Sequence, residues 1–207
     1  MAIHESQSRI YENQLARSWP FTDWLFGQMK DAFGDLGVSD ADGFYRAVNS
    51  VKNGYIRTEA DELQYNLHIM LRYDLERALI AGDLMINDLE AAWNDRFLAD
   101  FGYAVPKASL GMLQDIHWSE CLIGYFPTYA IGNIYAACLR EAMLNDAPNA
   151  IDELANGRTD TARTWLRDNV QQHGRRYKAQ EVIEKATGQV ASSEPLVRYI
   201  REKFAEL

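Results

Sequence analysis

The sequence has little cysteine, little proline and a deficit of positive charge. Its two cysteines, Cys121 and Cys138, both lie in apolar surroundings, which excludes a disulfide framework and predicts a reducing, cytoplasmic location. Lys and Arg number 21 against 30 Asp and Glu, a formal net charge of −9. Nucleic-acid and basic membrane surfaces need an excess of Lys and Arg, so we expect neither partner. With 5 Pro, 13 Gly and 47% hydrophobic residues, the chain can bury a core and is not disordered.

The sequence also lacks a clear membrane segment. Residues 121–139 carry no charge and approach the length of a membrane span. They include Pro127, Asn133, two glycines and three tyrosines, so the run is too polar for lipid and predicts a buried helix of a soluble protein. No basic patch followed by an apolar run opens the chain, so we expect no signal peptide.

Apolar residues recur with a period near 3.6 almost everywhere and near 2 almost nowhere, which predicts an all-α fold. We expect one multi-helix domain over residues 1–207. Asp40 or Ser39 suits the N-cap of a helix, and Gly82 and Gly102 suit helix ends. Residues 103–125 are expected to be irregular. The predicted helices cover residues 5–19, 21–33, a segment after 40, 58–81, 87–101, 127–145, 159–172, 180–187 and 194–204.

Local spacing gives no complete metal site. The four histidines lie at positions 4, 68, 117 and 173, so no two of them share a helix face in the i, i+4 pattern of zinc peptidases. No C-x-x-C, nucleophile triad or Gly-rich phosphate loop is present. His68 lies within the long apolar helix expected at 58–81, and we interpret it as structural.

Two polar stretches have competing interpretations. Residues 4–7 read H-E-S-Q, and Glu5 there suits the positive end of a helix dipole. Residues 56–61 read I-R-T-E-A-D, in which Thr58 and Asp61 form a capping-box pattern. Arg57 would face that same positive end, so we expect it to hold an anion. A ligand carboxylate and a salt bridge to one of the 30 acidic side chains are equally good candidates for that anion.

A third stretch, residues 111–118, reads G-M-L-Q-D-I-H-W. Asp115 and His117 lie two residues apart in backbone expected to be irregular. Tyr125 and Tyr129 follow, beside the uncharged helix. This combination predicts the wall of a pocket, although a single buried histidine is commonly just a core residue.

In this order the three stretches resemble the motifs of the carboxypeptidase Taq family of zinc metallocarboxypeptidases: H-E-[S/G]-Q, [I/V]-R-x-x-A-D and G-x-x-Q-D-x-H-W. Residues 62–68, 124–129 and 165–177 resemble the family as well. The family's upstream H-P-F, D-x-R-x-T and zinc-binding H-E-x-x-H are absent. The chain therefore resembles the C-terminal part, less than half, of a larger helical metallopeptidase. Residues 120–123, E-C-L-I, also replace a Gly-rich tract.

The resemblance implies roles for residues near the substrate. Arg57 matches the arginine that grips the C-terminal carboxylate of a peptide. His117 and Tyr129 match groups that contact the scissile carbonyl or that carboxylate and stabilise developing negative charge. Gln114 and Asp115 are expected to support them.

The resemblance also implies a metal. Glu5 matches the third zinc ligand, with cobalt as an alternative metal, while two histidines and the general base belong to the absent H-E-x-x-H. One carboxylate near a chain end holds zinc weakly. We therefore expect no tightly bound metal and no peptide hydrolysis by this chain alone.

Three interpretations follow. The chain is a substrate-recognition part of a carboxypeptidase that awaits a missing N-terminal half, a non-catalytic helical binding or interaction protein derived from that fold, or a fragment with no separate role. The family resemblance also implies a homodimer.

Overall fold

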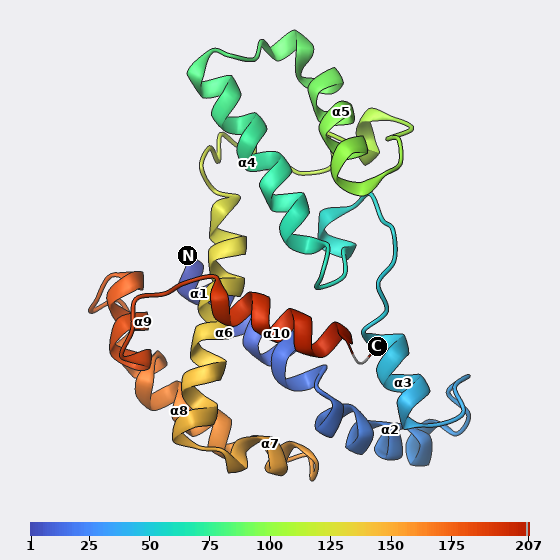
Figure 1. Cartoon of the computed structure of the whole chain (residues 1–207), viewed down its shortest axis with the longest axis vertical. Coiled ribbons are helices and arrows are strands. Elements are labelled where there is room, and N and C mark those ends of the chain that lie inside the picture. Colours follow the sequence, from blue (N-terminus) through green and yellow to red (C-terminus); the bar gives the residue numbers. More distant parts are fainter. Residues whose placement is uncertain (206) are drawn as a thin grey trace. The chain divides into compact units, whose positions relative to one another are not determined.

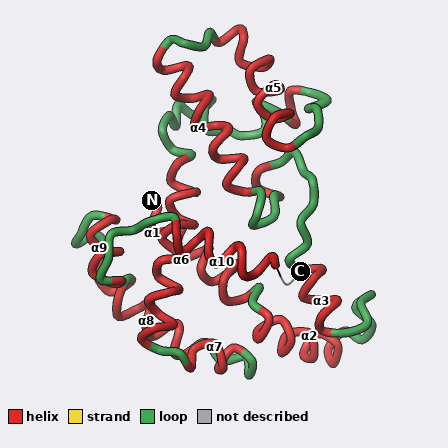
Figure 2. The backbone as a smooth tube through the Cα atoms, in the orientation of Figure 1, coloured by secondary structure: helices red, strands yellow, loops and turns green. Residues whose placement is uncertain are grey.

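The computed structural model describes residues 1–205 and 207. Those residues form helices joined by loops, with no strand among them (Figures 1 and 2), which confirms the all-α prediction. The chain divides into two compact units. Unit 1 comprises residues 1–50 and 131–207, and unit 2 comprises residues 51–130. The single domain over residues 1–207 stays a prediction.

Unit 1 holds most of the helices. Asp40 caps the helix that follows it, as the sequence predicts, because its Oδ1 accepts a hydrogen bond from the Gly43 N–H at 2.8 Å. Pro20 lies in the first turn of a helix that begins at Trp19 rather than at the expected Phe21. A π-helical segment, Ile10–Ala16, follows α1. The helices are α1 (Ala2–Arg9), α2 (Trp19–Phe33), α3 (Ala41–Val48), α6 (Pro127–Asp146, which begins in unit 2), α7 (Asn149–Leu154), α8 (Asp160–Asn169), α9 (Ala179–Thr187) and α10 (Glu194–Ala205).

The core of unit 1 is apolar and draws on the π-helical segment, α6, α7, α8 and α9. Burial of this set removes a large apolar area from water, which is the main driving force for folding. Its most enclosed members include Ile10, Leu139, Met143, Leu166 and Ile183.

Unit 2 is built on α4 (Tyr65–Ala81) and α5 (Leu89–Phe101). Gly82 and Gly102 end these helices with φ of 79° and 82°, a left-handed conformation that glycine adopts without strain. Between the two helices pack Leu71, Leu75, Leu89, Trp93 and Phe97. Residues 103–126 are largely irregular, as expected, and contain the short 3-10 turn Ala108–Leu110.

The predicted start of the long helix in unit 2 is wrong. The chain forms a 3-10 turn at Arg57–Glu59 and α4 begins at Tyr65, because Ala60 is extended, with ψ of 141°. The predicted capping box does not form. Instead Asp61 accepts hydrogen bonds from the backbone N–H groups of Gln64, at 2.9 Å, and Lys52, at 3.1 Å. Arg57 therefore does not face the N-terminus of α4, and the dipole argument for its anion does not apply.

Other differences are smaller. The first helix begins at Ala2 rather than Glu5 and passes into the π-helical segment. The short helix α7 has no counterpart among the predicted helices. Along the described part of the chain, none of the helices combines the length and hydropathy that a bilayer crossing requires.

Candidate functional site

Three predicted site residues meet in unit 2, although they come from three segments. Arg57 lies in the 3-10 turn, His117 in the irregular segment and Tyr129 in the first turn of α6. The guanidinium carbon of Arg57 lies 4.7 Å from the centroid of the Tyr129 ring, and the Tyr129 hydroxyl lies 3.0 Å from His117 Nε2. Positions 57, 117 and 129 thus share one neighbourhood. That they form one hollow together with position 5 stays a prediction.

Arg57 is buried, with 5% of its surface exposed, and it is ion-paired. Its Nη2 and Nε lie 2.7 and 2.9 Å from Asp115 Oδ1, and its Nη1 donates to the Tyr65 hydroxyl at 3.0 Å. Of the two anions considered for Arg57, the structure contains the salt bridge. Binding of a ligand carboxylate stays a prediction.

Asp115 joins two arginines. Its Oδ2 lies 2.7 Å from Nε of Arg72, a fully buried side chain on α4 whose Nη1 donates to the His68 carbonyl at 2.7 Å. Burial alone would raise the pKa of Asp115, but Arg72 and Arg57 outweigh it and leave the pKa below its usual value. Asp115 is therefore an anion shared by two cations.

The two arginines respond differently to this shared carboxylate. Burial lowers the pKa of Arg72 to about 10 despite the attraction of Asp115. For Arg57, burial acts in the same direction but Asp115 outweighs it, so the pKa of Arg57 is raised. The difference in sign follows from the deeper position of Arg72. Both arginines carry their charge at neutral pH.

Gln114 fixes the backbone around Arg57. Its Oε1 accepts from the Arg57 N–H at 2.8 Å. Its Nε2 donates to the carbonyls of Tyr55, at 2.9 Å, and of Leu110 and Gly111, both at 3.1 Å. Gln114 and Asp115 thus hold the backbone and the side chain of Arg57, which is the arrangement that their expected supporting role requires.

His117 is a neutral histidine at the edge of this cluster. Burial lowers its pKa, and its ring packs 4.4 Å from the Phe126 ring centroid. His117 Nδ1 has no hydrogen-bond partner within the described residues and lies 3.8 Å from Asp115 Oδ1. With the proton on Nε2, the ring donates to Tyr129, whose own hydroxyl hydrogen then turns to another acceptor. The pair can in this way present a donor to a carbonyl or carboxylate oxygen.

Glu5, the predicted metal ligand, belongs to unit 1. Its Oε1 lies 2.9 Å from Nε of Arg9 on the same helix. The Glu5 side chain packs on α6 at Gly132, where an added Cβ would lie 2.6 Å from Glu5 Cβ and Cγ. Because Gly132 has no side chain, the aliphatic part of Glu5 can pack directly against α6 at this position. A common site for Glu5 and the unit 2 cluster stays a prediction.

The described residues by themselves do not fit a zinc site. Nowhere in residues 1–205 and 207 do three or more His, Cys, Asp or Glu side chains gather as metal ligands would. Glu5 offers one carboxylate, already paired with Arg9. A structural or catalytic zinc needs at least three protein ligands.

Arg72 is a site residue that the sequence patterns did not reveal. It lies on α4 one turn after His68, and both side chains are fully buried. Its position beside Leu71 and one turn after His68, on the buried side of α4, is the signal that could have revealed it, because a buried cation needs a paired anion. That anion is Asp115.

Comparison with known proteins places these residues in context. The family model for carboxypeptidase Taq (M32) metallopeptidases matches residues 1–204. Thermostable carboxypeptidase 1 of Thermus thermophilus is 37% identical over 207 residues, which are 100% of this chain and 41% of that protein. Carboxypeptidase 1 of Bacillus subtilis is 37% identical over 211 residues, or 100% of this chain and 42% of that protein.

Solved structures of carboxypeptidases resemble this chain as well. An M32 carboxypeptidase from Deinococcus radiodurans superposes with a TM-score of 0.95 at 41% identity, covering 99% of this chain and 42% of that one. The carboxypeptidase of Pyrococcus furiosus gives 0.94 at 37% identity, covering 98% and 41%. The chain spans about two-fifths of the length of these relatives, so its fold is part of a larger helical one.

Proposed function

Because this chain belongs to the carboxypeptidase Taq (M32) family of metallopeptidases, we propose that it supplies the part of a metallocarboxypeptidase that recognises the C-terminal end of a peptide. One observation carries the proposal: Arg57 lies against the Tyr129 ring, and the Tyr129 hydroxyl meets His117. A cation and hydrogen-bond donors in one place are what a terminal carboxylate and its neighbouring carbonyl require.

The proposed roles follow from the contacts. Arg57 would pair with the carboxylate of the peptide, while Asp115 keeps the guanidinium oriented through Nε and Nη2. Tyr129 would donate to a carboxylate or carbonyl oxygen, with His117 holding the phenol oxygen at 3.0 Å. Because burial lowers the pKa of His117, it would serve as a neutral hydrogen-bonding group rather than as a cation.

Zinc, or cobalt in its place, would activate water when bound in a complete enzyme. Glu5 is the residue of this chain that we assign to it. Since the described residues do not gather three ligands, we assign no hydrolytic step to this chain, and we propose that alone it releases no amino acid. A polypeptide matching the rest of the relatives' length is the proposed partner, with a homodimer and a cytoplasmic location also proposed.

A second function, non-catalytic peptide or protein binding, is favoured by one feature. Arg57, Gln114 and Asp115 form a closed set of hydrogen bonds within unit 2, so the recognition cluster needs no metal to hold its shape. The same binding experiment bears on both functions. Zinc-dependent release of a C-terminal amino acid after the proposed partner polypeptide is added would favour the first function over the second.

The binding test compares a short peptide acid, acetyl-Ala-Ala, with its C-terminal amide, by calorimetry on the whole chain. We expect the acid to bind and the amide to bind at least about tenfold more weakly, a difference of about 1.4 kcal/mol. The Tyr129→Phe variant, which removes one hydrogen bond, should bind the peptide acid about five- to tenfold more weakly. Equal binding of acid and amide would contradict the recognition role.

The hydrolysis test incubates the chain with a longer peptide, with and without zinc. No released C-terminal amino acid is expected in either case. Release that requires zinc and stops on addition of a chelator would show that the chain is a complete enzyme. It would leave the binding result intact.

A further inference from the structure

Unit 1 contains a hollow of about 200 Å³ that the proposed function does not use. It is smaller than the roughly 300–1,000 Å³ of pockets for drug-sized ligands. Aromatic and aliphatic side chains form one part of its lining, namely Trp19, Tyr45, Ile151 and Tyr199, and charged side chains form another, namely Arg140, Glu202 and Lys203.

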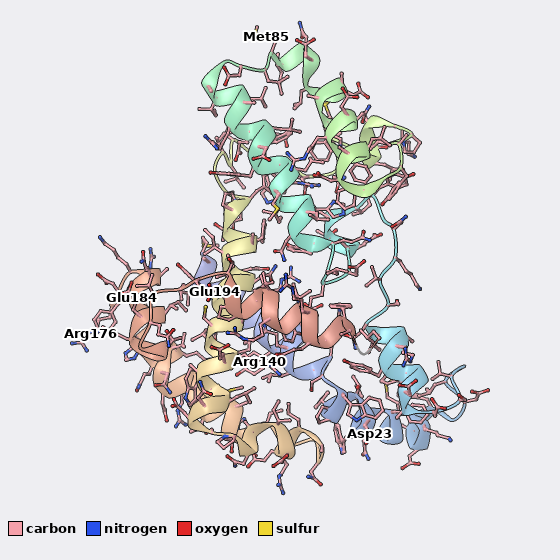
Figure 3. The ribbon with its side chains drawn as sticks, viewed as in Figure 1. Asp23, Met85, Arg140, Arg176, Glu184 and Glu194 are labelled. Atoms are coloured by element: carbon pink, nitrogen blue, oxygen red, sulfur yellow. The ribbon has the colours of Figure 1, made fainter. Side chains whose placement is uncertain are left out.

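Arg140 is the unusual member of this lining. It lies on α6 with its guanidinium carbon 5.2 Å from the Tyr199 ring centroid on α10, and Figure 3 labels it there. Its Nε is enclosed and has no hydrogen-bond partner within the described part of the chain. The next residue, Glu141, is paired with Arg198 at 2.7 Å.

The enclosed Nε–H of Arg140 therefore lacks an acceptor, although the side chain as a whole is only half-buried. A buried donor without an acceptor costs about 1–3 kcal/mol, and more when the group is charged. Buried polar groups in native proteins are almost always satisfied, by protein, water or a ligand. Since Arg140 lines the hollow, an anion bound there would pair with its guanidinium.

A second cation is fixed nearby. Lys203 is 8% exposed, and its Nζ donates to the Asn13 carbonyl at 3.2 Å and to the Tyr199 hydroxyl at 3.1 Å. Glu202 also lines the hollow. Among the described residues the lining thus carries one net positive charge, which suits a monoanion.

The remaining lining selects an apolar body for that monoanion. Trp19 and Tyr45 meet edge to face, with ring centroids 5.4 Å apart, and Ile151 adds an aliphatic side chain. Rigid aromatic walls of this kind bind flat or aliphatic groups by burial of apolar surface.

We propose that this hollow is a binding site for small organic monocarboxylates, with the carboxylate paired to Arg140 and the apolar body against Trp19 and Tyr45. Arg140 is suited to this task because its planar fork matches a carboxylate in two-point geometry. The site is separate from the peptide-recognition cluster, since it is built from unit 1 residues alone.

The test uses 3-phenylpropionate and its neutral amide, titrated into the ¹⁵N-labelled chain while the Arg140 side-chain Nε–Hε signal is followed by NMR. We expect the acid to shift this signal saturably and the amide to bind at least about tenfold more weakly. The Arg140→Leu variant should bind the acid at least about tenfold more weakly. The matched control is Arg163→Leu on α8, whose guanidinium pairs with Asp160 at the surface, and it should bind as the unaltered chain does.

Equal binding of acid and amide, no shift at Arg140, or undiminished binding by Arg140→Leu would overturn the proposal. If Arg140→Leu does not fold, the acid and amide titrations of the unaltered chain still decide, because the perturbed signals either do or do not come from the lining of the hollow.

Discussion

The two units bury different kinds of side chain. Unit 1 buries apolar side chains together with uncharged polar ones such as Asn13, Gln14 and Asn133. Among the described residues of this unit Lys203 is the one buried member of the Lys, Arg, His, Asp and Glu classes. Unit 2, although smaller, buries five side chains of these classes: Arg57, His68, Arg72, Glu76 and His117.

We interpret this difference as a difference in role: unit 1 is mainly structural, and unit 2 carries the candidate recognition site. Replacing buried ion pairs by apolar residues is commonly neutral or stabilising, so such pairs are weak evidence for stability. The two arginines that share one carboxylate in unit 2 are consistent with the proposed recognition of an anion there. Unit 1, by contrast, has the composition of a scaffold, on which Glu5 is placed by packing on Gly132.

The largest effect is expected from breaking the shared carboxylate of unit 2. Asp115→Ala leaves Arg57 and Arg72 buried without their anion, and should lower the free energy of unfolding by about 3–5 kcal/mol. Urea titration followed by tryptophan fluorescence measures this. As a control, Arg163→Ala removes the same kind of pair at the surface, with Asp160, and should change the free energy of unfolding by less than about 1 kcal/mol. Similar small effects of both variants would show that the buried network does not stabilise unit 2.

The second-largest effect is expected at acid pH, where protonation of His68 lowers the free energy of unfolding. Both ring nitrogens of His68 lack partners among the described residues, and burial lowers the pKa of His68 to about 3. In the unfolded chain the pKa is near 6.5, so the unfolded state binds the proton first. The stability that neutral His68 contributes is complete above about pH 6.5 and is lost as the pH falls towards 3.

Between about pH 7 and about pH 4 this loss amounts to about 3 kcal/mol for His68 alone. A leucine there has similar volume and no proton to bind. His68→Leu should therefore reduce the fall in unfolding free energy over this range by that amount, measured by urea titration at each pH. An unchanged pH dependence would mean that His68 titrates normally. Arg163→Leu on unit 1 should leave the pH dependence as it is.

The smallest effects on stability are expected from two glycine substitutions in unit 1. Gly132→Ala would place a Cβ 2.6 Å from the Glu5 stem and should cost about 1–3 kcal/mol through overpacking. At Gly27, inside α2, an added Cβ would meet nothing within 4 Å, so Gly27→Ala should instead stabilise by about 0.5–1 kcal/mol. Thermal unfolding of both variants tests the pair. A stabilising Gly132→Ala would show that Glu5 moves aside at no cost.

Local patterns were sufficient for much of the fold. The period of apolar residues predicted the helices, and Asp40, Gly82 and Gly102 marked a start and two ends, because caps depend on residues within one turn of each other. The start of α4 was missed for a related reason. Thr58 and Asp61 have the spacing of a capping box, but Asp61 instead binds the backbone of Lys52, a contact that no local pattern encodes.

The sequence by itself determined the helical class, the helix ends and the three motifs that identify the family. Only the tertiary structure decided which charges meet. Asp115 reaches Arg57 across 58 positions and Arg72 across 43, while Glu141, the neighbour of Arg140, pairs with Arg198 instead. Helix formation depends on residues three and four positions apart, whereas the pairing of distant charges depends on how the whole chain closes around them.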